Sequence, residues 1–102
     1  MIKISTSNPS GLLAAIKKAI DDGHIETWSY DNDGDFTHTP AQWRNKAWLR
    51  PTIAKDELQL RIIPPENGIV TKEVSAVYHG RFIEMLSAHF DTRFTGATSS
   101  IP

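Results

Sequence analysis

Apolar residues recur at helical spacing in only two stretches of this chain, and this pattern restricts the fold more than any other sequence feature. In the first stretch the spacings are three and four, and the residues are Leu12, Leu13, Ile16, Ala19 and Ile20. Either Ser7 or Asn8 is suited to cap such a helix before Pro9, and Gly23 is suited to end it in a left-handed conformation. The pattern predicts a helix over residues 9–22.

The second helical stretch follows the break PPENG (64–68) and predicts a helix from about residue 71 or 72 to 90. Its large apolar residues lie on one broad side: Val74, Val77, Tyr78, Phe82, Met85, Leu86 and Phe90. The opposite side is small or charged: Glu73, Gly80, Glu84 and Ser87. A helix with one apolar side has to bury that side against another layer of structure.

The remaining segments predict strands. Residues 2–5 and 58–62 alternate between apolar and polar types, which is typical of half-buried strands. Residues 25–30 and 35–38 are joined by Asp33-Gly34, a strong hairpin-turn dipeptide. The segment 39–42 resembles a capping box and predicts one helical turn up to about residue 45. Residues 46–53 are extended, with Pro51 indicating an edge strand or a bulge.

The predicted order is therefore β-α-β(β)-β-β-α, and the fold class is α+β. We expect a two-layer sandwich in which both helices cover one face of a mostly antiparallel sheet. The other face must then be polar, bind a ligand or meet another copy of the chain. Residues 1–91 form the expected single domain, and 92–102 a loosely held tail from which Phe94 and Ile101 can dock on the body.

Charge and composition exclude several classes of function. The 102 residues carry a formal charge of −1, with scattered basic residues, which argues against a dedicated nucleic-acid binder. The chain has no cysteine, so thiolate metal sites, disulfides and a cysteine nucleophile are excluded. No segment resembles a signal peptide or a membrane span. We therefore expect a cytoplasmic protein that contacts neither nucleic acid nor membrane.

The alternating aspartates Asp31, Asp33 and Asp35 raise the question of a calcium loop. An EF-hand needs glycine at its sixth position and glutamate at its twelfth, where this chain has Phe36 and Gln42. Asp and Asn favour turns, and Gly34 permits the positive φ of a hairpin turn. We interpret the segment as a turn and expect no metal site.

Histidine and carboxylate residues suggest one catalytic arrangement, in which His38 or His79 pairs with Asp35 or Glu84 as acid and base. No serine elbow, metal motif or nucleotide loop accompanies these residues, so we predict no catalytic residue and no cofactor, and an enzyme is the less favoured class. His79 and His89 are too far apart on the second helix to share a metal ion. For both we favour a packed histidine with a hydrogen-bond partner.

An aromatic concentration in the middle third is the main candidate binding surface. The candidate residues come from the predicted strands and loops between them: Trp28, Tyr30, Phe36, His38, Trp43, Trp48 and Arg50. If they lie on the helix-free face of the sheet, they form a patch suited to a protein partner or a flat ligand. If instead the tryptophans fill the core, at least two of them serve packing alone. The sequence leaves these two explanations equally open.

Three segments resemble parts of small bacterial proteins of the kind carried on mobile elements such as integron gene cassettes. They are WSYDNDGDFTHTPAQW (28–43), KAWLRP (46–51) and YHGRFIEMLSAHF (78–90). The resemblance implies a bacterial, cytosolic, stand-alone domain, and it implies no activity, substrate or catalytic residue.

Two functions follow as hypotheses. The first is a small non-enzymatic interaction module that forms a homodimer, or binds or inhibits a partner protein, through an aromatic-rich sheet face. The alternative is a small-molecule-binding protein or minor enzyme with a pocket near residues 31–45 and the second helix, lined by His38, His79, Asp35 and Arg50.

Overall fold

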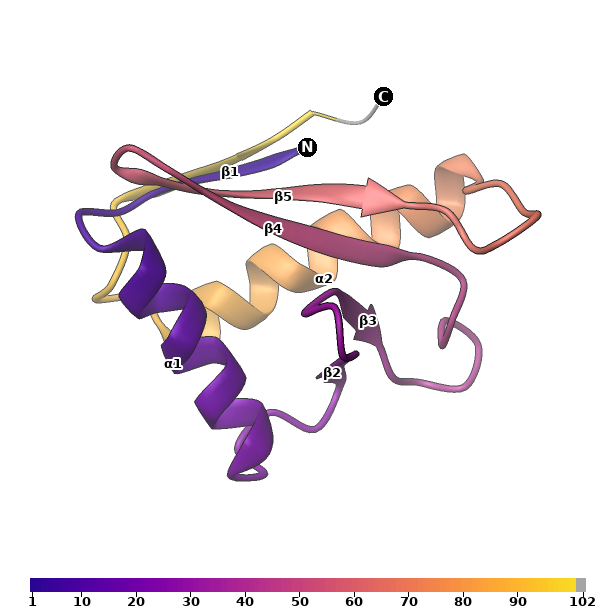
Figure 1. The fold of residues 1–102 in the computed structure, drawn as a ribbon, viewed down its shortest axis with the longest axis horizontal. Helices are drawn as coiled ribbons and strands as arrows, with labels where there is room; N and C mark the ends of the chain where they lie inside the picture. The colour runs from indigo at the N-terminus through magenta and orange to yellow at the C-terminus, as the bar shows by residue number, and fades with distance from the viewer. Residues whose placement is uncertain (101–102) are drawn as a thin grey trace.

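The computed structural model describes residues 1–100 and confirms the α+β class. The elements in chain order are β1 (Ile2–Ser5), α1 (Pro9–Asp21), β2 (Trp28–Tyr30), β3 (Phe36–His38), β4 (Trp48–Ala54), β5 (Glu57–Ile63), α2 (Lys72–His89) and β6 (Gly96–Ser99). In Figure 1, β1, β5 and β4 run across the top of the molecule, β2 and β3 lie lower, α1 lies below the upper strands, and α2 runs diagonally from the upper right to the lower left; this arrangement is consistent with a two-layer sandwich. Neither helix in this range has the length and apolar character needed to span a bilayer.

The sheet has the strand order β2-β3-β4-β5-β1-β6, and every neighbouring pair is antiparallel. Side chains alternate between its two faces. Many of those facing the helices are fully buried, among them Ile2, Ile4, Leu49, Leu58 and Leu60. The face away from the helices, which we call the open face, carries polar residues such as Lys3, Thr52, Gln59 and Arg61. An antiparallel sheet with one solvated face shows this alternation.

Backbone pairing is dense in one part of the sheet and sparse in another. β4 and β5 pair along their whole lengths, and β1 pairs with both β5 and β6. We call these four strands the ladder half. The β2–β3 hairpin, which we call the hairpin half, meets β4 at the single pair Phe36↔Leu49. Pro51 lies beyond that pair, where β4 has an edge on the β3 side, so its missing N–H interrupts no ladder there.

Both predicted helices are confirmed, and their ends have the expected caps. The Asn8 carboxamide accepts a hydrogen bond from the backbone N–H of Gly11 at 3.0 Å, and Pro9 occupies the first turn. Gly23 follows the helix with φ of +80°, a conformation that glycine adopts without strain. Thr71 caps α2 through the N–H of Val74 at 3.2 Å. The residues predicted to face water on α2 are all exposed: Glu73, Gly80, Glu84 and Ser87.

The C-terminal segment contains a strand that the sequence did not predict. β6 pairs with β1 in the register Ile4↔Ala97, and the Thr95 N–H donates to the Ser5 carbonyl at 2.8 Å. Phe94 packs partly against the core, as the sequence analysis allowed. The predicted docking of Ile101 lies outside the described residues. The tail residues 96–99 therefore form one edge of the sheet.

Candidate functional site

A groove of about 750 Å³ lies between three segments that are distant in sequence. One is the connection 23–28 between α1 and β2, the second is the segment 38–43 after β3, and the third is the C-terminal half of α2. Its lining combines aromatic, apolar and charged side chains, including Trp28, His38, Trp43, Arg81, Glu84 and Met85. The volume falls within the range of about 300–1,000 Å³ that is typical of small-molecule sites.

The inner part of the groove is formed by a cross-strand pair. Trp28 on β2 lies directly opposite His38 on β3, and their ring centroids are 4.6 Å apart with an interplanar angle of 35°. From α2, Tyr78 and Phe82 make edge-on contacts with the Trp28 ring at 5.6 and 5.1 Å. These packed aromatic contacts fix the orientation of the pair, since both side chains are about 95% buried or more.

His38 has a defined tautomer. Its Nδ1 lies 2.7 Å from the backbone carbonyl oxygen of Thr27. A carbonyl can only accept, so Nδ1 carries the proton and, in the neutral ring, Nε2 carries a lone pair. Burial lowers the pKa of His38 and outweighs the hydrogen bond to Thr27, which favours the protonated ring. At neutral pH the side chain is therefore an uncharged hydrogen-bond acceptor at Nε2.

Two polar atoms of the pair have no partner in the described part of the protein. No hydrogen bond is formed there by His38 Nε2 or by the indole N–H of Trp28. Within residues 1–100 the one fully buried side-chain nitrogen or oxygen without a partner is Nε2 of His79. The two unpaired atoms of Trp28 and His38 therefore keep some solvent contact, and the groove is the hollow that both residues line.

Trp43 forms a wall of the groove, and Tyr78 holds it in place. The Tyr78 hydroxyl donates to the backbone carbonyl of Trp43 and lies 3.0 Å from the Thr37 hydroxyl, which in turn donates to the Ala47 carbonyl at 3.0 Å. Backbone hydrogen bonds from Trp43 and Arg44 to the Pro40 carbonyl close the turn predicted for residues 39–45. One buried hydroxyl on α2 thus ties the wall to strand β3.

The rim of the groove carries charges of both signs. Arg81 and Glu84 form an exposed ion pair at 3.2 Å, which contributes little to stability. His24 and His89 are also exposed at the rim. Although three histidines line the groove, the described residues hold a single cluster with metal-ligand spacing, and that cluster is the aspartate turn.

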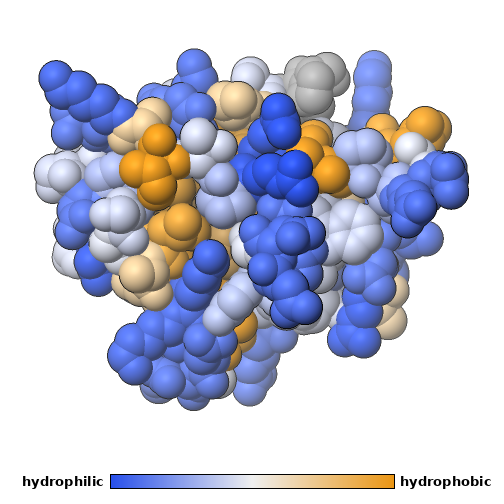
Figure 2. Space-filling view, viewed as in Figure 1, coloured by the Kyte–Doolittle hydropathy of each residue, from blue (hydrophilic) through white to orange (hydrophobic). Residues whose placement is uncertain are grey.

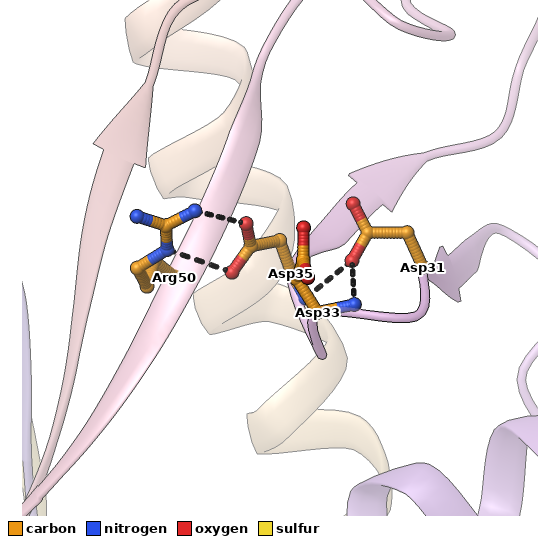
Figure 3. A network of polar contacts seen from close by, with 4 residues as sticks. All are labelled: Asp31, Asp33, Asp35 and Arg50. Carbon is orange, nitrogen blue, oxygen red and sulfur yellow. Dashed lines mark hydrogen bonds and ion pairs between the residues drawn. The ribbon is translucent and has the colours of Figure 1, made fainter.

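The aspartate turn uses its oxygen atoms for local structure, as Figure 3 shows. The Asp31 carboxylate accepts from the backbone N–H groups of Asp33 and Asp35 at 3.0 and 2.9 Å. The buried Asp35 carboxylate forms a two-pronged pair with Arg50, from Nε at 3.1 Å and from Nη2 at 2.8 Å. Gly34 adopts φ of +83°, as the hairpin turn requires. The turn predicted for this segment is confirmed.

The structure divides the seven predicted binding residues among three places. Trp28, Phe36 and His38 are buried on the helix side of the hairpin, with Tyr30 half-buried beside them. Trp43 lines the groove wall. Trp48 and Arg50 lie on the open face. The sequence left open whether the tryptophans fill the core or form a surface patch. Core packing applies to Trp28, and of the three tryptophans Trp48 lies on the open face.

The predicted polar lining is also divided. His38 lines the groove, whereas the pair formed by Asp35 and Arg50 lies outside it. His79 is buried in the core, where its Nδ1 lies 2.6 Å from the Ser75 carbonyl oxygen. The predicted packed histidine is thus confirmed for His79, while His89 is exposed. Burial lowers the pKa of His79, and the positive N-terminus of the chain lowers it further.

The surface visible in Figure 2 is largely hydrophilic, and its apolar residues form small separate patches. Two large apolar side chains in the described range are clearly exposed, Ile53 and Ile69, at 46% and 81%. Ile69 lies with Trp43 on a second hollow. The chain matches no protein-family model, and comparison with curated proteins and with solved structures finds no significant relative.

Proposed function

We propose that this protein binds a small molecule in the groove between α2 and the hairpin half. The observation that carries the proposal is the pair formed by Trp28 and His38. Two buried rings line a hollow of ligand size, and no hydrogen bond in the described residues uses the Trp28 indole N–H or His38 Nε2. Concave sites that combine aromatic surface with a few fixed polar groups are typical of small-molecule recognition. The proposal corresponds to the alternative hypothesis from the sequence, with a different set of lining residues.

The electrostatics support an uncharged or weakly charged ligand. Neutral His38 lies inside the groove, and the exposed Arg81 and Glu84 offset each other at the rim. Glu26 adds one further carboxylate to the lining, so a strongly anionic ligand would meet no matching positive charge there. Packed neighbours hold Trp28 and His38 in fixed orientations, which reduces the entropy lost when a ligand is bound.

The proposal is tested by nitrogen–proton correlation spectra recorded while small aromatic fragments are titrated into the protein. The three tryptophans give three indole signals: Trp28 and Trp43 report on the groove, and Trp48 reports on the open face. Binding in the groove is expected to shift the Trp28 and Trp43 signals and leave the Trp48 signal in place. A bound fragment should also raise the melting temperature.

A pair of variants isolates the groove. Ala88 lies on the exposed surface of α2 and lines the groove, so Ala88→Phe fills it without disturbing the core. Ala14 is exposed on α1 and lies outside the groove, so Ala14→Phe is a matched control. We expect Ala88→Phe to abolish fragment binding and Ala14→Phe to retain it. Equal binding by both variants would contradict the proposal.

A second candidate function is self-association or protein binding through the open face. The observation that favours it is the cross-strand pair formed by Trp48 and Ile63, two half-buried apolar side chains on an otherwise polar face. Light scattering over a tenfold concentration range tests it, with Trp48→Ala as the variant. A dimer that dissociates in the variant supports this function, and a monomer at every concentration removes self-association.

We also propose a cytoplasmic location. The absence of cysteine from the sequence is compatible with a reducing compartment, where disulfides rarely form. Fractionation of cells that express the tagged chain tests the location directly. Recovery in the membrane or secreted fraction would contradict it.

A further inference from the structure

We propose, as an extension of the ligand-binding function above, that the groove selects planar ligands with an amide-type edge. Such an edge presents a carbonyl oxygen and an N–H group side by side, as in a lactam, a primary carboxamide or a nucleobase. Trp28 would donate to the carbonyl oxygen, and His38 would accept from the N–H group. The inference depends on the hydrogen-bonding capacity of these two rings and on their proximity.

The acceptor is His38 Nε2. The contact of Nδ1 with the Thr27 carbonyl, at 2.7 Å, places the ring proton on Nδ1 and leaves the Nε2 lone pair unused. In the part of the chain that the structure describes, the hydrogen bond of the His38 ring is formed by Nδ1 and none is formed by Nε2. A ligand N–H that reaches Nε2 would satisfy it without moving the proton on the other side of the ring.

The donor is the indole N–H of Trp28, a group that can donate and cannot accept. Because Trp28 and His38 are cross-strand partners with ring centroids 4.6 Å apart, the donor and the acceptor belong to adjacent side chains in one hollow. A single planar amide edge offers the complementary acceptor and donor in adjacent positions. The pair therefore recognises both ends of one functional group.

Other common ligand groups leave one of the two atoms unpaired. A carboxylate or a phosphate ester can accept from Trp28 but offers no proton to His38, and its charge faces the histidine lone pair. An ammonium group can donate to His38 but offers no acceptor to Trp28. A polar group left unpaired in a partly desolvated site costs about 1–3 kcal/mol. This difference in hydrogen bonding is the basis of the predicted selectivity.

Trp43 accounts for the preference for a planar ligand. Its side chain is half-buried on the groove wall, and the hydrogen bond from Tyr78 to its carbonyl oxygen fixes its backbone. An aromatic wall offers a flat apolar surface against which a planar ring packs in an offset or edge-on arrangement. The wall and the two inner rings together match a small heterocycle whose polar edge points inward.

The test compares three probes in the wild-type protein by titration of the indole signals. Uracil carries the amide edge, its derivative with both ring nitrogens methylated keeps the carbonyls but has no N–H donor, and benzoate has a planar ring with a carboxylate. We expect uracil to shift the Trp28 signal furthest and to bind at least about tenfold more tightly than the other two, which corresponds to about 1.4 kcal/mol. The Trp48 signal should not move.

Two substitutions remove the donor and the acceptor separately. Trp28→Phe keeps an aromatic ring but has no N–H, and Trp48→Phe is its control on the open face. His38→Phe removes the acceptor, and Trp48→Phe on the open face is its control as well. We expect each inner variant to lose the preference for uracil over its methylated derivative, as read from the Trp43 signal. If an inner variant fails to fold, the comparison of the three probes in the wild-type protein still tests the preference for an amide-type edge.

The possible outcomes separate this inference from the proposed function. Equal binding of uracil and its methylated derivative, or tightest binding of benzoate, would overturn the amide-edge inference while leaving ligand binding in the groove intact. A shift of Trp48 in place of Trp28 would also overturn it. If no probe and no aromatic fragment moves the Trp28 or Trp43 signal, the proposed function fails as well.

Discussion

The two halves of the sheet are held together in different ways. In the ladder half, β4, β5, β1 and β6 are joined by continuous backbone pairing. The hairpin half shares one residue pair with β4, and side chains supply its other connections. They include the hydrogen bond from the Thr37 hydroxyl to the Ala47 carbonyl, the ion pair formed by Asp35 and Arg50, and the packing of Trp28 and Phe36 on Phe82.

This difference explains why the groove lies beside the hairpin half. A dense ladder satisfies its own backbone groups and packs its inner face with aliphatic side chains, which offer a ligand no polar atoms. The hairpin half is packed with rings that carry nitrogen atoms, and two of these atoms remain without a protein partner in the described residues. Polar groups available for recognition therefore occur in the hairpin half, which is held in the sheet mainly by side-chain contacts and not by backbone pairing.

The largest expected effect is that of Trp28→Ala. Trp28 is 2% exposed and contacts three rings, so its removal should lower the free energy of unfolding by about 3–5 kcal/mol. Trp48→Ala, on the open face, is the control and should cost about 1 kcal/mol or less. Urea unfolding of both variants gives the comparison. Equal losses would mean that the hairpin half does not depend on its aromatic core.

Tyr78→Phe should have the next largest effect. It removes the hydroxyl that connects α2 to Trp43 and to Thr37, and it leaves buried polar atoms without that partner. The expected loss of unfolding free energy is about 1–3 kcal/mol. Tyr30→Phe is the control because its hydroxyl bonds the Asp21 carboxylate at the surface, and its loss should be smaller. The Trp43 indole signal should broaden or shift in Tyr78→Phe alone.

The stability of the protein should decrease as the pH falls below about 6.5. Burial lowers the pKa of His38 and of His79 from the ordinary value of 6.5. Just below that pH, the unfolded chain therefore binds more protons than the folded chain. The contribution of the two neutral histidines to the unfolding free energy is fully present above pH 6.5, and it is lost as the pH falls through their pKa values in the folded protein. Denaturant unfolding at pH 7.5 and at pH 5.5 should show the loss.

Variants assign this pH dependence to the two halves. His38→Gln should remove the contribution of the hairpin half, and His79→Gln that of α2 beneath the sheet. His89→Gln at the exposed rim should leave the dependence unchanged. If His38→Gln and His79→Gln retain the full pH dependence of the wild-type protein, neither histidine is its source.

The smallest expected effect is a gain in stability. Gly80 lies on the exposed side of α2, and a Cβ atom there would meet no other atom within 4 Å. Gly80→Ala should therefore raise the free energy of unfolding by about 0.5–1 kcal/mol. Gly23→Ala also meets no atom, but its φ of +80° is unfavourable for alanine, so it should destabilise the protein. Thermal unfolding distinguishes the two signs.

The sequence predicted those elements whose signals are local. Helix α1 was predictable because Asn8, Pro9 and Gly23 mark its ends, and the hairpin turn because Gly34 follows Asp33. β6 was not predictable, since GATS (96–99) has neither apolar alternation nor strong strand propensity, and it forms because β1 offers an unpaired edge. In this segment the tertiary context outweighs the local preference.

The candidate site could be predicted only in part, because it depends on register and on a distant helix. The pairing of Trp28 with His38 requires the hairpin register, in which residues ten apart become direct neighbours. His38 lies in the polar sequence THTP (37–40), so its burial under α2 leaves no local sign. His79 was easier to predict, since it lies on a helix beside apolar residues. Sequence patterns thus identified the aromatic residues but not the face on which they meet.

The strand order leads us to expect a particular order of events during folding. β2, β3, β4 and β5 follow one another in the chain and in the sheet, so each pairing closes a loop that is short in sequence. β1 differs, because Ile2 pairs with Leu60 on one side and with Ser99 on the other. We expect a chain emerging from the ribosome to form the meander of β2 to β5 early, to pair β1 with β5 next, and to add β6 to β1 only after β6 has been synthesised. The half with the most continuous pairing is therefore the half whose assembly is completed last.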